Sequence, residues 1–76
     1  MKITKGIQSI IEAAKLRGFL VDISDTDIDI YKKTSTGKVT KGIRICENGW
    51  AYRMDIDLGS TTWIKSQKSM REVLEL

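Results

Sequence analysis

Apolar residues recur with a period of two from Phe19 to Leu58, and this alternation constrains the fold more than any other feature of the sequence. Apolar and polar side chains alternate in four segments, which are 19–23, 27–31, 42–46 and 50–58. Successive side chains of a β-strand point to opposite faces of a sheet. Each segment is therefore predicted to be a half-buried strand.

Three two-residue turns would join these strands into hairpins. They are Asp25-Thr26, Thr36-Gly37 and Asn48-Gly49, of which the last is the strongest turn signal. Together they set a register that pairs apolar residues: Val21 with Ile30, Ile23 with Ile28, Ile30 with Ile43, Ile28 with Ile45, Ile45 with Tyr52, and Ile43 with Met54. Trp50 falls on the same apolar face. Because a slip of one residue turns a strand over, this agreement predicts the register of the whole sheet.

Helical patterns flank the strands. Residues 4–17 have a candidate N-cap at Thr4 and end before Gly18, which suits a helix C-terminus. A final helix is predicted to begin at Ser66 or Ser69. The apolar stripes of the two helices, with helical spacing, are Ile7, Ile10, Ile11 and Ala14, and then Met70, Val73 and Leu74.

The order of these elements predicts an α+β fold, with one two-layer domain over residues 1–76. Its order is α-β-β-β-β-α, and the four strands form an antiparallel meander with both helices on one face. Two helices are about as wide as four strands, so the layers close the core without a second subunit. A monomer suffices, and the oligomeric state stays open. It also stays open whether Trp63-Ile64 starts the last helix, and whether Trp63 is core or interface.

Residue counts exclude several kinds of chemistry. The chain has 76 residues, no histidine and one cysteine, Cys46. Without histidine there is no Ser-His or Cys-His catalysis and no zinc site with His ligands, and a lone cysteine forms no intrachain disulfide. The sequence lacks an apolar run long enough to predict a membrane span or a signal peptide. We expect a cytoplasmic, non-enzymatic protein with no cofactor, no metal and no small-molecule substrate.

Lysines surround the tip of the hairpin predicted at Thr36-Gly37. A flexible basic ribbon can follow a phosphate backbone or enter a groove of a nucleic acid. The chain is also mildly basic, with 13 Lys and Arg against 10 Asp and Glu. We therefore expect a nucleic acid or a nucleoprotein to bind Lys32, Lys33, Lys38 and Lys41 of the hairpin and Lys65 and Lys68 of the final segment. The alternative is that lysines at a strand edge keep the sheet soluble.

The face of the sheet that points away from the helices is expected to be of mixed charge. In the predicted register one row across the strands reads Asp22, Asp29, Arg44, Arg53, and the next reads Leu20, Tyr31, Gly42, Asp55. Tyr31 is the one aromatic residue of these rows, whereas sheets that bind single-stranded nucleic acid use several for stacking. Such a face suits a polar protein partner. The predicted protein-interface residues are Tyr31, Arg44, Arg53 and Trp63.

A third hypothesis is a metal-dependent enzyme that uses Asp29, Asp55 and Asp57. Asp55 and Asp57 share one strand face, and Asp29 is within reach across the sheet. Arg44 and Arg53 would lie between these strands, however, and would neutralise the carboxylates. Ordinary cross-strand charge pairing, worth ~0.2–1 kcal/mol per pair, is the favoured interpretation.

The order helix, strands, helix is similar to that of double-stranded-RNA-binding domains. Lys65, Ser66, Gln67 and Lys68 loosely match the basic run that opens the last helix of that family, whereas the fourth strand departs from the family's pattern. The chain also resembles small HicA-type toxins, which use a histidine that is missing here, and small phage-encoded inhibitors of bacterial defence. These resemblances imply RNA binding in the first case and a protein-binding inhibitor or adaptor, of phage or mobile-element type, in the last. None of them assigns the chain to a family.

Overall fold

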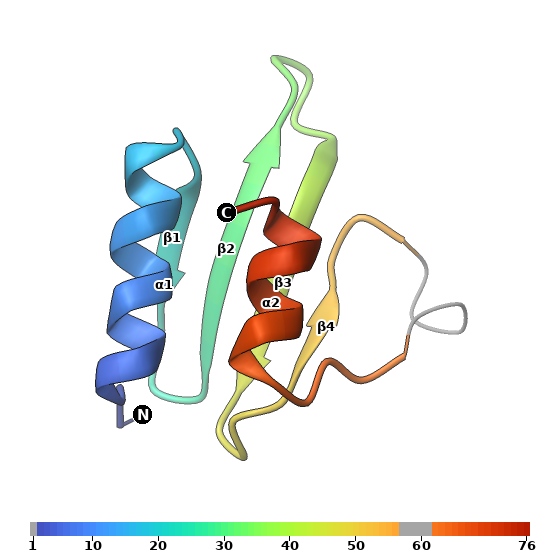
Figure 1. Cartoon of the computed structure of the whole chain (residues 1–76). Coiled ribbons are helices and arrows are strands. Elements are labelled where there is room, and N and C mark those ends of the chain that lie inside the picture. Colours follow the sequence, from blue (N-terminus) through green and yellow to red (C-terminus); the bar gives the residue numbers. More distant parts are fainter. Residues whose placement is uncertain (1, 57–61) are drawn as a thin grey trace.

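The computed structural model describes residues 2–56 and 62–76 and confirms the predicted element order (Figure 1). The elements are α1 (Lys5–Leu16), β1 (Leu20–Ile23), β2 (Asp27–Lys33), β3 (Val39–Cys46), β4 (Ala51–Arg53) and α2 (Gln67–Leu74). The strands form one antiparallel sheet in the order β1-β2-β3-β4, and both helices lie on the same side of it.

Local signals in the sequence fix both ends of α1. The Thr4 hydroxyl accepts a hydrogen bond from the Ile7 N–H at 3.2 Å and caps the N-terminus. At the other end the Phe19 N–H bonds the Ala14 carbonyl and the Gly18 N–H bonds the Lys15 carbonyl, which is a Schellman motif. Gly18 has φ +85°, a value that favours glycine. The N-cap of α2 is Ser66, one of the two serines at which this helix was predicted to begin.

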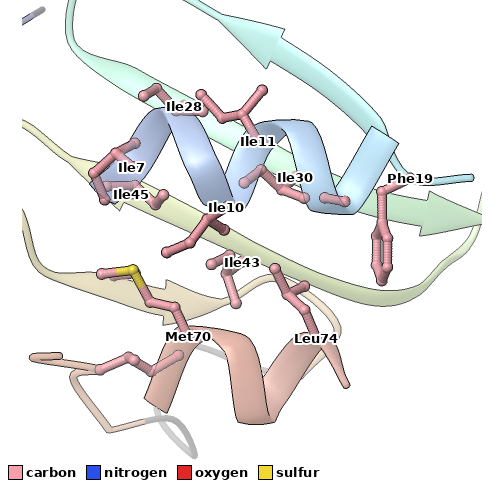
Figure 2. Packing of buried hydrophobic residues seen from close by; sticks show 13 residues of the cluster. Ile7, Ile10, Ile11, Phe19, Ile28, Ile30, Ile43, Ile45, Met70 and Leu74 are labelled. Atoms are coloured by element: carbon pink, nitrogen blue, oxygen red, sulfur yellow. The ribbon is translucent and has the colours of Figure 1, made fainter. Parts of the chain in front are cut away.

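The core lies between the helices and the sheet. Figure 2 shows side chains of α1 and α2 directed at isoleucines of β2 and β3. The buried cluster contains Ile7, Ile10, Ile11, Ala14, Phe19, Ile28, Ile30, Ile43, Ile45, Ala51, Ile64, Met70 and Leu74. Both predicted helical stripes are therefore in the core, with Val73 packed at its margin.

The register of β1, β2 and β3 agrees with the prediction, although the second turn is built differently. Val21 pairs with Ile30, and Ile30 with Ile43. The loop is residues 35–37, closed by hydrogen bonds from Thr34 N–H to the Lys38 carbonyl and from Gly37 N–H to the Thr34 carbonyl. This three-residue loop displaces the pairing by one residue, and a bulge at residue 40 of β3 restores it. The two irregularities cancel.

The register of β4 differs from the prediction by one residue. The Cys46 N–H bonds the Trp50 carbonyl at 2.8 Å, and the Gly49 N–H bonds the Cys46 carbonyl at 2.9 Å. With Gly49 at φ +86°, this is a three-residue loop, a type I turn followed by a glycine bulge, in place of the predicted two-residue turn. No bulge follows among the described pairs, so Ile45 faces Ala51 and the predicted pairing with Tyr52 is wrong.

The slip turns β4 over. Ala51 is fully buried, whereas Trp50, predicted to be core, is 37% exposed. Strand β4 ends at Arg53, well before Leu58. The expected end of that strand, with Asp57 and Leu58, lies outside the described residues.

Trp63 and Ile64 precede α2, and Ile64 joins the sheet at the edge of β4. Ile64 forms an antiparallel bridge with Ala51, in which its N–H and its carbonyl both bond the Ala51 main chain. The bridge places Ile64 in the core and leaves Trp63 half exposed. The question left open by the sequence is answered here, because neither residue is helical.

Candidate functional site

The side of the sheet opposite the helices, which we call the open face, carries a different set of residues from the predicted one. Its central row reads Asp22, Asp29, Arg44, Tyr52. Arg53, predicted to be the last member of this row, is paired with Ile43 of the core face instead. The cause is the slip at Gly49, which exchanges Arg53 for Tyr52.

Three aromatic rings pack together at the β4 side of the open face, and we call them the aromatic cluster: Trp50, Tyr52 and Trp63. The Trp63 ring centroid is 5.9 Å from that of Trp50 and 5.7 Å from that of Tyr52, which it meets edge to face. Such tilted arrangements are favourable for aromatic pairs. The bridge between Ala51 and Ile64 explains the cluster, because it sets Trp63 beside Tyr52.

The same bridge sets Lys65 beside Trp50. The Lys65 ammonium lies 4.5 Å from the Trp50 ring centroid, a cation–π contact. The cluster nevertheless remains accessible, since Trp63 is 50% exposed. A large, rigid and half-exposed indole is the kind of group that anchors an interface.

A chain of hydrogen bonds crosses the rest of the open face. The Arg44 guanidinium holds both carboxylate oxygens of Asp29, at 2.7 and 3.0 Å, and also donates to the Tyr52 hydroxyl at 3.3 Å. The Asp29 contact raises the pKa of Arg44. On β2 the Tyr31 hydroxyl donates to Asp22 at 2.8 Å, and this bond raises the pKa of Tyr31. Arg44 and Tyr31 are therefore held in fixed positions.

A small open pocket of about 230 Å³ borders the aromatic cluster. It is lined by Arg44, Tyr52, Arg53, Met54 and Ile56. Both arginines of the pocket are paired with carboxylates. Arg53 donates to Asp55 at 2.6 and 3.1 Å, and Arg44 is paired with Asp29. The Arg53 hydrogen bonds lower the pKa of Asp55. The pocket walls are thus close to electrically neutral.

The six lysines predicted to bind nucleic acid do not form one surface. The Lys41 ammonium pairs with Glu75 at 2.8 Å, and the Lys32 ammonium lies 4.6 Å from the Phe19 ring centroid, so both are engaged on the helix side of the sheet. Lys33 and Lys38 are exposed near the hairpin tip. Lys65 lies against Trp50, near the turn between β3 and β4 at the other end of the sheet, and the exposed Lys68 lies in the first turn of α2.

The residues of the metal-enzyme hypothesis are not gathered into a site. Asp29 and Asp55 are each held by an arginine, and Asp57 lies outside the described residues. Within residues 2–56 and 62–76, no group of three or more His, Cys, Asp or Glu is placed to hold a metal ion. Burial raises the pKa of the Cys46 thiol, which disfavours the reactive thiolate.

Comparisons of the chain with protein-family models, with curated proteins and with solved structures gave no match. The likeness to double-stranded-RNA-binding domains therefore rests on the order of the elements and the Lys65–Lys68 segment, without a matching family or structure. In the described part of the chain, neither helix has the length and apolar character that crossing a membrane requires.

Sequence reasoning missed Trp50 and Tyr52 as surface residues. The signal was present in the loop itself, because Glu47-Asn48-Gly49 also fits a three-residue loop with glycine at the position of positive φ. That interpretation buries Ala51 and exposes its two aromatic neighbours.

Proposed function

We propose that this protein is a non-enzymatic binding module that holds a protein partner on the open face of its sheet. The observation that carries the proposal is the aromatic cluster beside Arg44, with two tryptophans 37% and 50% exposed on the face without helices. Tryptophan, tyrosine and arginine are the residues that most often dominate the binding energy of protein interfaces. An adaptor or inhibitor needs only such a surface.

The charges of the open face favour a protein over a nucleic acid. Asp22 and Asp29 lie in its central row, and Asp29 already neutralises Arg44. A phosphate backbone would meet these carboxylates, whereas sites for nucleic acid combine aromatic stacking with a positive groove. The two lysines engaged on the helix side, Lys32 and Lys41, also weaken the hairpin as a phosphate-binding ribbon.

Pre-organisation supports the same conclusion. Arg44 is fixed by Asp29 and Tyr52, and Trp63 is packed against two aromatic rings. Side chains that are ordered before binding lose less conformational entropy when the partner arrives. We expect Trp63 and Arg44 to be the residues whose truncation weakens binding most.

Site-specific photo-crosslinking tests the proposal. A photoreactive phenylalanine analogue replaces Trp63 in one variant and Leu16 in another, which is a matched control because Leu16 is 89% exposed on the helix side. Both variants are irradiated in a lysate of the organism that encodes the chain, with and without nuclease. We expect one protein to be captured at position 63, not at position 16, and to persist after nuclease treatment. Capture that is equal at both positions overturns the proposal.

Nucleic acid is the second outcome of the same test. Loss of the captured species on nuclease treatment would favour it, and so would salt-sensitive binding of a random duplex or single strand by the purified protein. Lys33→Glu with Lys38→Glu would then weaken that binding and flatten its salt dependence, since each phosphate contact contributes ~0.9 to the salt slope on duplex DNA. We expect no salt-sensitive binding of either probe.

A further inference from the structure

The free edge of the sheet at β1 offers a second interaction surface, which is independent of the proposed function. β1 is the first strand in the order β1-β2-β3-β4, and its pairing with β2 is continuous from Leu20 to Ile23. At the other side of the sheet, the segment around Ile64 covers β4 through its bridge to Ala51. The β1 edge of the sheet is therefore open, whereas the β4 edge is partly covered.

The alternation of antiparallel hydrogen bonds shows which main-chain groups point outward from β1. The Ser24 N–H bonds the Asp27 carbonyl at 2.9 Å, so Ser24 and Asp27 form a hydrogen-bonded pair. Every second pair is of this type, and the main-chain groups of Val21 and Ile23 consequently point away from β2. Among residues 2–56 and 62–76, no hydrogen bond from elsewhere in the chain reaches these groups.

The side chains of β1 protect this edge only weakly. Natural sheets guard exposed edges with short strands, charged residues (above all lysine), proline or bulges, and β1, a four-residue strand of sequence LVDI, has Asp22 as its one charge and no shift in its register. Two of its apolar side chains are well exposed, Leu20 at 44% and Ile23 at 54%. An edge of this composition is suited to pairing with another strand.

We propose that β1 pairs antiparallel with β1 of a second copy of this chain, around a two-fold axis at Val21. In this register Val21 faces Val21 of the second copy, and Phe19 faces Ile23. The Phe19 N–H already bonds Ala14, but its carbonyl can accept from the Ile23 N–H of the second copy. Both copies thus pair the outward main-chain groups of Val21 and the Ile23 N–H, whereas the Ile23 carbonyl stays exposed to solvent.

Charge selects this register over its neighbour. A shift by two residues would set Asp22 directly opposite Asp22 of the second copy, and like charges in that position are destabilising. The axis at Val21 instead sets Asp22 opposite Leu20, so that the two Asp22 side chains are only diagonal neighbours, as are the two Leu20 side chains, and their repulsion is weaker than in a direct pair. A shift in the other direction would need Arg17 and Gly18 to be extended, whereas Arg17 has ψ 7° and Gly18 φ +85°.

The charges on α1 do not oppose this pairing. The α1 side that faces α2 is marked by Gly6, which approaches Gln67, and by Ser9, which accepts a hydrogen bond from Arg71. By helical spacing, the opposite side of α1 carries Glu12 and Lys15. Two antiparallel copies of α1 would meet with one charge of each sign, and no net repulsion opposes the joined sheet.

Disulfide trapping tests this register directly. The cysteine variants are made in a Cys46→Ser chain, which lacks the native thiol. Val21→Cys lies on the proposed axis, where the Cα atoms of a hydrogen-bonded pair are ~5.5 Å apart, within the range of a disulfide. We expect mild oxidation to convert Val21→Cys, but not the matched Asp22→Cys, into a covalent dimer. Circular dichroism confirms that both variants are folded. Trapping through Asp22→Cys alone would overturn the proposed register.

Analytical ultracentrifugation of the unmodified wild-type chain tests the pairing, and one variant, Ile23→Lys, serves for comparison. We expect a concentration-dependent dimer, and Ile23→Lys should raise its dissociation constant at least tenfold, because it introduces a charge opposite Phe19. The urea midpoint of the dilute, monomeric variant should stay close to that of the wild type, since Ile23 is mostly exposed. A chain that stays monomeric at millimolar concentration overturns the proposal.

Discussion

Gly42 lies in β3 directly opposite Tyr31 of β2, and replacing it with alanine tests the packing of the sheet. A Cβ atom at this position would lie 2.7 Å from the Tyr31 Cβ and 3.1 Å from the Ile30 carbonyl oxygen. Neither atom can swing away, because one is main chain and the other is attached to it. The two strands must separate, or Tyr31 must move and strain its hydrogen bond to Asp22.

The magnitude follows from two opposing effects. Alanine is favoured over glycine inside a strand by ~0.5–1 kcal/mol, because it loses less backbone entropy on folding. Overpacking a site that cannot relax costs ~1–3 kcal/mol. We therefore expect Gly42→Ala to lower the free energy of unfolding by ~1–2 kcal/mol, which corresponds to a fall in Tm of ~4–16 °C for a domain of this size.

Gly6→Ala is the matched control. The three atoms nearest to its Cβ would all belong to the side-chain amide of Gln67, which is the far end of an exposed, flexible side chain. That side chain can move aside, so the higher helix propensity of alanine should stabilise the protein by up to ~1 kcal/mol. Both variants are compared with the wild type by urea unfolding. A Gly42→Ala protein as stable as the wild type would refute the packing of β2 on β3.

Three further predictions concern other contacts. Gly49→Val should destabilise the fold by ~1–3 kcal/mol, since a β-branched residue resists the φ of +86°, and an unchanged Tm would contradict the loop assigned to β3 and β4. Arg44→Ser should cost ~1–3 kcal/mol in urea unfolding because it leaves the partly buried Asp29 unpaired, and Asp29→Asn in the same chain should restore part of the loss. Because the pKa of Asp55 is lowered in the folded state, its ion pair with Arg53 stabilises the protein above the ordinary carboxyl pKa. This contribution is lost as the pH falls through the folded-state pKa, so Arg53→Gln should show a flatter decline of stability with acid, and an identical acid profile would contradict the pairing.

The alternation of apolar residues was sufficient to predict the strands and most of their register, and the helical spacing of apolar residues predicted the two helices that complete the layers. Val21, Ile30 and Ile43 are paired as predicted because only one arrangement buries all of them. The second turn was nevertheless mistaken in its details. The pattern could not reveal this, since the bulge at residue 40 cancels the extra loop residue.

The open face was predicted less well, for a physical reason that can be traced to Gly49. Two-residue and three-residue loops both use a glycine at this position, and they differ by one residue in the strand that follows. In this segment Trp50 and Tyr52 alternate with Ala51. Residue type alone does not decide whether the two aromatic residues or Ala51 face the core. Burial of Ile64 against Ala51 decides between them, and this contact joins segments that no local pattern connects.

The two tryptophans of the chain both belong to the aromatic cluster, so the affinity of a captured partner is the most direct measure of the central claim. The purified partner is titrated against the wild type, Trp63→Ala and Leu16→Ala, with folding of each variant checked beforehand. We predict that Trp63→Ala weakens binding ~30-fold or more, as expected for a hot-spot residue worth ~2 kcal/mol, and that Leu16→Ala stays within about twofold of the wild type. Equal affinities for all three proteins, or a larger loss with Leu16→Ala, would contradict binding at the open face.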